Sequence, residues 1–427
     1  LRAYAQGSED PTPTPPPDRE PTGNRQTVIT FFSSLSGADY DAFGKIAADY
    51  EASQPDVGVR ISYAPGHAEN PRLLTTLAAG DAPDVAMMGD FHNAQYVELG
   101  VVADLTDKFN EAGLTQEDFY PSAWQSMYYK DRIWHLPYEV DPNFPLFWNQ
   151  QWFEEAGLDP ETGPETFEDI DTFNQAILKE ENGTVTQIGM EAWDVYGYAN
   201  ALFTWGFCHG ATFYDEEKQE VTPDNDQAMQ ALEWMVRFAQ DVGGPDRVSI
   251  APPNLGVHSM AAGRLGMAPL VMANFRDVLR YAPDLRLGQG LLPYGGTATA
   301  MGEGAWSGGW RLFIPNGAKN VDAAWDFIYW MSCTDEGTRS QYKHQGFPPG
   351  WTKAPVNEEF KNDPDRRIYY EALVSARNAR PNIPVGAYYM AQLEEKVSMA
   401  VYGEMEPRAA MEEVKELTMN EWERFGR

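Results

Sequence analysis

Several features that mark common protein classes are rare or missing in this sequence of 427 residues. The two cysteines, Cys208 and Cys333, form no disulfide framework, and each is interpreted as a small buried apolar residue. No run of 18 or more apolar residues occurs, so no membrane-spanning helix is expected. Positive charge is scarce, with 32 Lys and Arg against 64 Asp and Glu and a formal net charge of −32. A surface of that sign repels nucleic acid and anionic membranes, so neither is an expected partner.

Motifs for common catalytic and cofactor chemistry are also missing. The six histidines show no ligand spacing, and no phosphate-binding loop, dinucleotide glycine pattern or nucleophile elbow is present. A pair of glycosidase carboxylates could stand among the acidic residues, but no local pattern singles one out. We therefore expect neither a metal nor a cofactor, and a binding protein rather than an enzyme.

The first 26 residues have a composition of their own. Six prolines lie within Pro11–Pro21, and bulky apolar residues are almost absent. This composition predicts that residues 1–26 form a disordered, extended tether. A tether at this place indicates a lipid anchor upstream, and the start at Leu1 rather than Met indicates a processed or truncated chain.

From Thr27 onward, strand-like and helical patterns alternate. The stretches TVITFF, VGVRISY and PDVAMM predict buried strands, separated by amphipathic helical segments. This alternation predicts a parallel α/β sheet. After about Leu136 helical patterns dominate, and they are predicted over Pro164–Glu181, Asp226–Asp241, Val321–Ser332, Ala387–Gly403 and Pro407–Arg424.

Aromatic residues gather in loops rich in glycine, proline and polar residues. Examples are EAWDVYGYANALFTWGF, GFPPGW and GAWSGGWRLFIP. Each such tryptophan could be part of the core, but several that meet in one cleft would suit a sugar. Sugars stack their C–H faces on aromatic rings and need polar partners for their hydroxyl groups.

The order of these motifs resembles the extracellular solute-binding proteins of bacterial ABC transporters, in the family that includes maltose-binding protein. The resemblance extends from Thr27 to the end of the chain. It is carried by TTLAAGDAPDVAMM, LPYEVDPNFPLFWNQQWFEEAGLD, GPETFEDI, SMAAGRLGMAPL, SGGWRLFIPNGAKN and AAWDFIYWMSCTDEG, in the family's order. The chain departs from the family where Trp148 stands for the usual Tyr, Gln150 for Lys and Phe167 for Trp.

The resemblance implies a two-lobed α/β fold of the periplasmic-binding-protein type (type II), with a cleft between lobes joined by a hinge. The N-terminal lobe is expected over 27–138 plus 312–345, and the C-terminal lobe over 139–311 plus 346–427. It also implies an extracytoplasmic monomer, periplasmic or a cell-surface lipoprotein, that closes on a carbohydrate and delivers it to ABC permease subunits. A Cys208–Cys333 disulfide would tie the two lobes together, so both thiols are predicted to be free.

Candidate ligand contacts come from both lobes. Serines after the first strand and residues after the third lie at the carboxyl edge of the sheet, where open α/β sheets bind ligands. Gly308 and Gly309 would leave room for a ligand, with Trp310 stacked on it. The full set is Ser34, Ser36, Asp90, Phe91, Asp141, Asn143, Trp193, Trp205, Arg276, Trp306, Gly309, Trp310 and Trp351.

Other interpretations stay open at this point. Ser34, Ser36 and Asp90 could cap helices, Trp310 could belong to the core, and Arg276 could pair with a carboxylate. The ligand could be a polyamine, a peptide or, through paired tyrosines, a ferric ion. A secreted enzyme acting on glycans is the remaining alternative.

Overall fold

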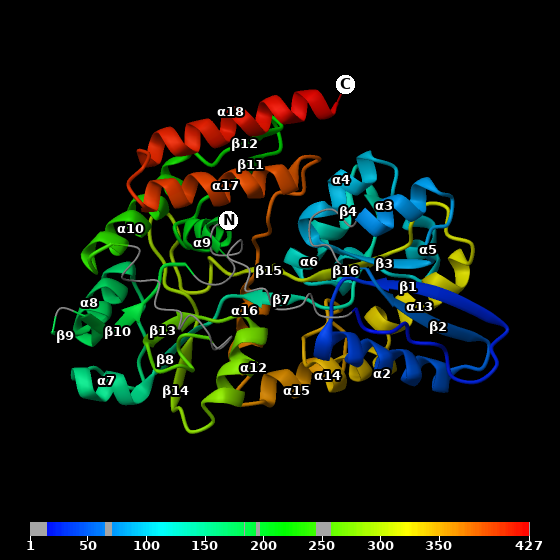
Figure 1. Ribbon diagram of the computed structural model, residues 1–427, viewed down its shortest axis with the longest axis horizontal. Helices are drawn as coiled ribbons and strands as arrows, with labels where there is room; N and C mark the ends of the chain where they lie inside the picture. The colour runs from blue at the N-terminus through cyan, green and yellow to red at the C-terminus, as the bar shows by residue number, and fades with distance from the viewer. Residues whose placement is uncertain (1–14, 65–70, 183, 194–196, 245–257, 427) are drawn as a thin grey trace.

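The computed structural model describes residues 15–64, 71–182, 184–193, 197–244 and 258–426. They form two lobes side by side along the long axis of the molecule, each with its own five-stranded sheet (Figure 1). The predicted two-lobed α/β fold is thus confirmed. Among the described residues, every helix is too short or too polar to cross a membrane.

The sheet of the N-terminal lobe has the order β2-β1-β3-β16-β6. Its parallel strands β1 (Thr27–Ser33), β2 (Val57–Tyr63) and β3 (Val85–Gly89) are the three that their apolar runs predict. The antiparallel strands β16 (Trp310–Phe313) and β6 (Leu136–Pro137) complete it from distant parts of the chain. The helices of this lobe are α2 (Gly37–Ser53), α3 (Pro71–Ala78), η1 (Asp90–His92), α4 (Asn93–Glu98), α5 (Thr106–Glu111), α6 (Pro121–Met127), α13 (Val321–Cys333) and α14 (Asp335–Gln345).

The sheet of the C-terminal lobe has the order β14-β8-β13-β10-β9. Its strands are β14 (Leu287–Gly290), β8 (Leu146–Asn149), β13 (Leu265–Pro269), β10 (Thr184–Met190) and β9 (Lys179–Glu181). Its helices are α7 (Gln150–Ala156), α8 (Phe167–Ile177), α9 (Gly197–Cys208), α10 (Asp226–Asp241), α12 (Met272–Tyr281), α15 (Val356–Asn362), α16 (Arg367–Ser375), α17 (Gly386–Val401) and α18 (Pro407–Phe425). The helix predicted up to Glu181 ends at Ile177, because its last residues pair with β10 as β9.

Each lobe has its own hydrophobic core. Cys208 belongs to the core of the C-terminal lobe and Cys333 to that of the N-terminal lobe. Both thiols are buried and free, so the prediction that they do not form a disulfide is confirmed. Each lobe can therefore pack internally without a covalent link to the other.

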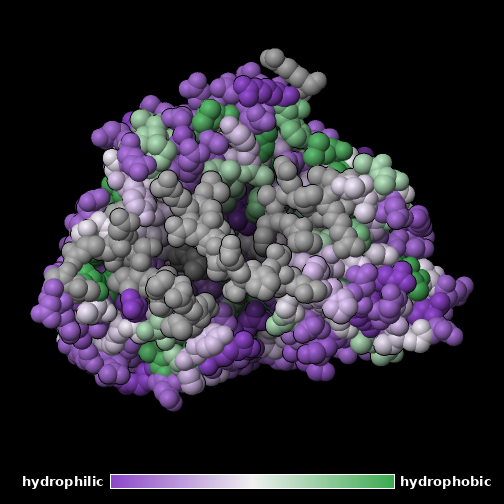
Figure 2. All heavy atoms as spheres, viewed as in Figure 1, coloured by the Kyte–Doolittle hydropathy of each residue, from purple (hydrophilic) through white to green (hydrophobic). Residues whose placement is uncertain are grey.

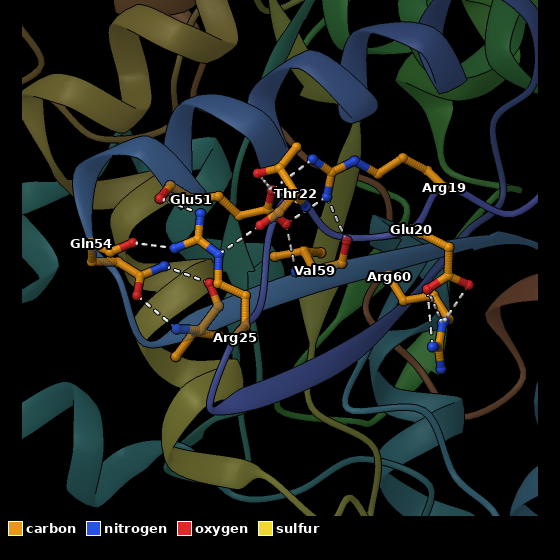
Figure 3. Close-up of polar contacts among 9 residues, drawn as sticks. Arg19, Glu20, Thr22, Arg25, Glu51, Gln54, Val59 and Arg60 are labelled. Atoms are coloured by element: carbon orange, nitrogen blue, oxygen red, sulfur yellow. Dashed lines mark hydrogen bonds and ion pairs between the residues drawn. The ribbon is translucent and has the colours of Figure 1, made fainter.

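Residues 15–26, here called the N-terminal strap, differ from the predicted disordered tether. Arg19 pairs with Ile61 of β2 through two backbone hydrogen bonds, and its guanidinium bonds both oxygens of Glu51 at 2.6 and 2.8 Å. Arg25 donates to the carbonyl oxygens of Glu51 and Gln54 at the end of α2 (Figure 3). These charged contacts hold the strap on the lobe, and proline-rich composition gave no sign of them. Residues 1–14 of the predicted tether lie outside the described residues.

Candidate functional site

Two short antiparallel strands cross between the lobes and form the floor of the candidate site. Strand β7 (Asp141–Asn143) follows β6, and β15 (Trp306–Gly308) precedes β16. Asp141 lies opposite Gly308, and Asn143 opposite Trp306. A third crossing runs from α14 to α15. Residues next to these crossings can contact groups from both lobes.

A buried arginine ties the two crossing strands together. Arg311 has no exposed surface, and its guanidinium donates to the carbonyl oxygens of Glu139 at 3.0 Å and Gly308 at 3.4 Å. Its Nε donates to the hydroxyl of Ser126 at 2.9 Å. Through these neutral oxygen acceptors Arg311 fixes the path of the hinge backbone.

Gly308 and Gly309, at the end of β15, leave room for neighbouring groups of the protein. A Cβ at Gly308 would lie 3.1 Å from the amide nitrogen of Asn143 and 3.3 Å from a guanidinium nitrogen of Arg380. Gly309 has a φ of +112°, and a Cβ there would lie 3.2 Å from backbone atoms of Glu139 and Asp141. The sequence interpretation assigned this space to a ligand, whereas the structure fills it with Arg380 and the opposite strand.

Acceptor oxygens line the other crossing strand. Asp141 and Asn143 alternate along β7 and therefore share a face, and Glu139 precedes them. Among the described residues, Glu139 Oε2, Asp141 Oδ1 and Asn143 Oδ1 are buried and accept no hydrogen bond. Each of these oxygens therefore keeps the capacity to accept a hydrogen bond.

Burial changes the protonation of the two carboxyls. It raises the pKa of Glu139 to about 8, with the charges of Asp141 and Asp39 adding to the effect. Burial likewise raises the pKa of Asp141 to about 7, although a backbone hydrogen bond from Met272 and the charge of Arg276 oppose it. Both carboxyls therefore keep a proton to a higher pH than an exposed carboxyl does.

The tryptophans divide into core and cavity positions. Trp306 is 1% exposed, donates from Nε1 to the hydroxyl of Thr204 at 3.0 Å, and packs edge-on against Phe144. Trp193 and Trp205 line a small cavity of about 20 Å³ in the C-terminal lobe, together with Phe144, Thr204, Glu191 and Pro269. Trp306 thus lies in the core behind this cavity, while Trp193 stands at its wall, with its ring centre 5.2 Å from that of Tyr198 and the two rings tilted.

Trp310 and Trp351 lie on the side of the N-terminal lobe. Trp310 is half-buried, its amide donates to Glu139 Oε1 at 3.3 Å, and its ring packs on the core of that lobe. Trp351 is also half-buried against that core, and its backbone bridges to Phe119. Of the two, Trp310 is the one placed beside the acceptor oxygens of the hinge.

The remaining predicted contacts differ in how far they can reach a ligand. Ser34 is buried, with a hydroxyl that has no partner among the described residues, whereas Ser36 is exposed at the start of α2 and makes no capping bond. Arg276 donates to the carbonyl of Gln345 at 2.7 Å and lies 5.0 Å over the ring of Phe347. Arg276 therefore links α12 to the end of α14, rather than pairing with the neighbouring Asp277.

Asp90 and Phe91 are joined by a residue that the sequence interpretation missed. Arg380 forms a buried ion pair with Asp90 and lies over the ring of Phe91 at 4.6 Å. Glu139 and Arg311 were missed as well, although both stand next to motif residues that were singled out. No local pattern marks Arg380, because its partners Asp90 and Asn200 are 290 and 180 residues away in the sequence.

A second recess, of about 340 Å³, lies between the lobes at residues 377–382. Its walls include Trp124, Tyr128, Phe213 and Tyr214. One polar side chain of its lining, Gln125, donates to the carbonyl of Arg377. The face drawn in Figure 2 is hollowed near its middle. No group of three metal-ligating side chains occurs within the described ranges.

Comparison with known proteins places this geometry in a family. The family of bacterial extracellular solute-binding proteins matches residues 35–333. The maltotriose-binding protein of Pyrococcus abyssi is 23% identical over 352 residues, which cover 79% of this chain and 69% of the relative. The sn-glycerol-3-phosphate-binding periplasmic protein UgpB of Escherichia coli is 24% identical over 309 residues, covering 69% and 68%.

Solved structures share the fold over nearly the whole chain. The structure of CpMnBP1 with mannobiose bound superposes with a TM-score of 0.78 at 23% identity, covering 92% of this chain and 100% of the other. The sugar-binding protein MalE of Xanthomonas citri superposes with a TM-score of 0.77 at 18% identity, covering 93% and 98%.

Proposed function

This chain belongs to the bacterial extracellular solute-binding proteins, and on that premise we propose that it captures a carbohydrate between its lobes and delivers it to the permease of an ABC importer. The relatives named for maltotriose and mannobiose support a sugar rather than another solute. In this role the protein acts outside the cytoplasm as a monomer, and a lipid anchor upstream of the strap would keep it at the membrane.

One observation supports a sugar as the ligand. Three buried acceptor oxygens, on Glu139, Asp141 and Asn143, have no donor among the described residues. The backbone amide of Trp310 donates to the other carboxyl oxygen of Glu139, and its half-buried ring packs on the core of the N-terminal lobe. Hydroxyl groups would supply the missing donors, and the apolar face of a sugar ring would cover the indole.

The proposed contacts are the hinge oxygens, Trp310, Ser34 and Asp90, with Trp193 on the side of the C-terminal lobe. Trp205, Trp306 and Gly309 support the site from behind, since they are buried or contact backbone. The proposed lobes keep the boundaries expected above, with hinge crossings near 138–141, 308–312 and 345–356. Closure would bring Trp193 toward the hinge and surround the sugar.

A thermal-shift panel tests the proposal. Mannobiose, maltotriose, cycloalternan and glycerol 3-phosphate are each added at increasing concentration. A ligand at about 100 times its Kd adds roughly 2.7 kcal/mol to the stability of the native state, which gives a clear shift. We expect a neutral sugar to stabilise the protein, and a response to glycerol 3-phosphate alone would contradict the proposal.

Two variants locate the site within the protein. Trp193→Ala should weaken binding of the stabilising sugar about fivefold or more, the scale of one aromatic contact of roughly 1 kcal/mol. Tyr128→Ala is the matched control, because Tyr128 is 40% exposed and lines the second recess. If Tyr128→Ala alone loses binding, the sugar occupies the second recess instead.

A further inference from the structure

Arg380 contacts more separate parts of the molecule than any candidate named from the sequence. It lies between α16 and α17, in a segment that runs along the junction of the lobes (Figure 1). Its side chain is 10% exposed, and its partner Asp90 is 3% exposed. An ion pair this buried is costly to separate, because each charge alone would lose its partner without gaining water.

The contacts of Arg380 come from both lobes. On the N-terminal side, its guanidinium pairs with Asp90 and lies 4.6 Å from the ring centre of Phe91. On the C-terminal side, it donates to Asn200 Oδ1 of α9 at 3.2 Å and lies 5.1 Å from the ring centre of Trp306. The guanidinium therefore joins an aromatic ring and an oxygen acceptor from each lobe.

Neighbouring residues are arranged to admit this side chain. The absent side chain of Gly308 leaves room for the guanidinium, which a Cβ would approach at 3.3 Å. Asn382, two residues later, accepts from the amide of Ala94 at 2.9 Å and so holds the same segment on the N-terminal lobe. Arg380 is thus presented from an anchored backbone toward α9 and Trp306.

We propose that Arg380 is an interlobe latch and a positioning residue: with Asp90, Phe91, Asn200 and Trp306 it fastens the two lobes beside the hinge in the absence of ligand and orients Asp90 for the cleft. The latch itself needs no sugar. Its second role, orienting Asp90 toward a ligand, rests on the proposed function.

The chemistry of the latch requires arginine. A planar guanidinium can lie against two rings while it donates to two oxygens in its own plane. A lysine at this position would keep the positive charge and one hydrogen bond to Asp90. It would lose the planar contact with the two aromatic rings and the second hydrogen-bond donor. Arg380→Lys should therefore loosen the lobes without leaving Asp90 unpaired.

Distance measurement between the lobes tests the latch in the full chain without any ligand. Spin labels are placed at Asp41→Cys on α2 and Glu168→Cys on α8, because both residues are exposed. The buried Cys208 and Cys333 are shielded from the label. We expect Arg380→Lys and Asp90→Asn to lengthen and broaden the distance distribution, and Arg380→Ala to do so most.

Arg377→Ala is the matched control. Arg377 lies in the same segment, but its guanidinium bonds only the nearby carbonyls of Val374 and Ala376, so the distribution should stay as in the wild type. If Arg380→Ala does not fold, Arg380→Lys and Asp90→Asn decide the question. The latch is refuted if these two folded variants keep the wild-type distribution.

Mannobiose titration of the Arg380→Lys and Arg380→Ala variants separates the latch from the proposed function, whereas Asp90→Asn is left out because Asp90 is itself a proposed sugar contact. If the latch holds, the ligand-free variants spend less time with the lobes fastened together, which is the arrangement that binds sugar. The Kd should then rise in proportion to this loss of population, roughly tenfold for a tenfold loss. A protein that binds no sugar, but whose lobes separate in Arg380→Lys, would refute the sugar proposal and keep the latch. If the protein binds sugar but the interlobe distances do not change in the variants, the latch is refuted and the sugar proposal is kept.

Discussion

The ion pair between Arg19 and Glu51 gives a sharp test of the N-terminal strap. The side chain of Glu51 has no exposed surface, and its carboxylate accepts from Arg19, from Thr22 twice and from the amide of Val59 at 2.9 Å. These hydrogen bonds outweigh the cost of burial and hold the pKa of Glu51 at about 2, against an ordinary 4.5. A shift of that size in a group shielded from solvent corresponds to about 3 kcal/mol at 1.36 kcal/mol per pKa unit.

Arg19→Ala removes the cation and leaves the carboxylate buried, so we expect a loss of about 3 kcal/mol in the free energy of unfolding of the N-terminal lobe. Deleting residues 1–26 should cost at least as much. The assay is urea unfolding, followed by far-ultraviolet circular dichroism and tryptophan fluorescence. Arg60→Ala is the control, since its pair with Glu20 is 43% and 63% exposed and should contribute less than about 1 kcal/mol.

The pH dependence gives an independent arm of the same test. Because the pKa of Glu51 is lowered on folding, its contribution is present above about pH 4 and is lost as the pH falls toward 2. Glu51→Gln should remove that part of the acid dependence. If Arg19→Ala were no more harmful than Arg60→Ala, the strap would not be fastened as described.

Three further predictions concern the hinge and the core. Burial raises the pKa of Asp141 to about 7, so between about pH 4 and 7 the folded state binds a proton that the unfolded state has lost. The free energy of unfolding should therefore fall as the pH rises through this range. Asp141→Asn should flatten this dependence when urea unfolding is measured at several pH values. Gly309→Ala should destabilise by about 1–3 kcal/mol in the same assay, because its φ of +112° disfavours a side chain, and an unchanged midpoint would contradict this. Trp306→Ala should cost about 3–5 kcal/mol as a core deletion, and a smaller loss accompanied by lost sugar binding would place Trp306 in the cleft instead.

Local patterns predicted the regular elements of this chain well. The apolar runs at Thr27, Val57 and Val85 became β1, β2 and β3, and the helix predicted over Asp226–Asp241 has those bounds in the structure. Their periodicity is a local property, so it can be read without knowing what packs against it. The two-lobed arrangement needed the order of several motifs along the chain.

Local sequence patterns could not predict contacts between residues that are distant in the sequence. Arg380 has no distinctive neighbours in the sequence, and its role depends on Asp90 and Trp306, which topology brings to it. The same holds for Arg19, whose proline-rich surroundings favour disorder until the buried carboxylate of Glu51 is in place. Trp306 illustrates the opposite error, since a tryptophan in a glycine-rich stretch was expected at a ligand and lies 1% exposed in the core.

Calorimetric titration of the Asp141→Asn variant tests the central claim most directly. The sugar that stabilises the wild type is titrated into wild type, Asp141→Asn and Tyr128→Ala at the same pH. At about pH 8.5 Asp141, with its pKa of about 7, is mostly charged. If sugar hydroxyls bond this carboxylate, the Kd of Asp141→Asn should rise about ten- to a hundredfold at that pH, since a hydrogen bond to a charged group contributes roughly 1.5–3 kcal/mol, and Tyr128→Ala should bind as the wild type does. An unchanged Kd for Asp141→Asn, or a loss confined to Tyr128→Ala, would contradict capture of the sugar at the hinge.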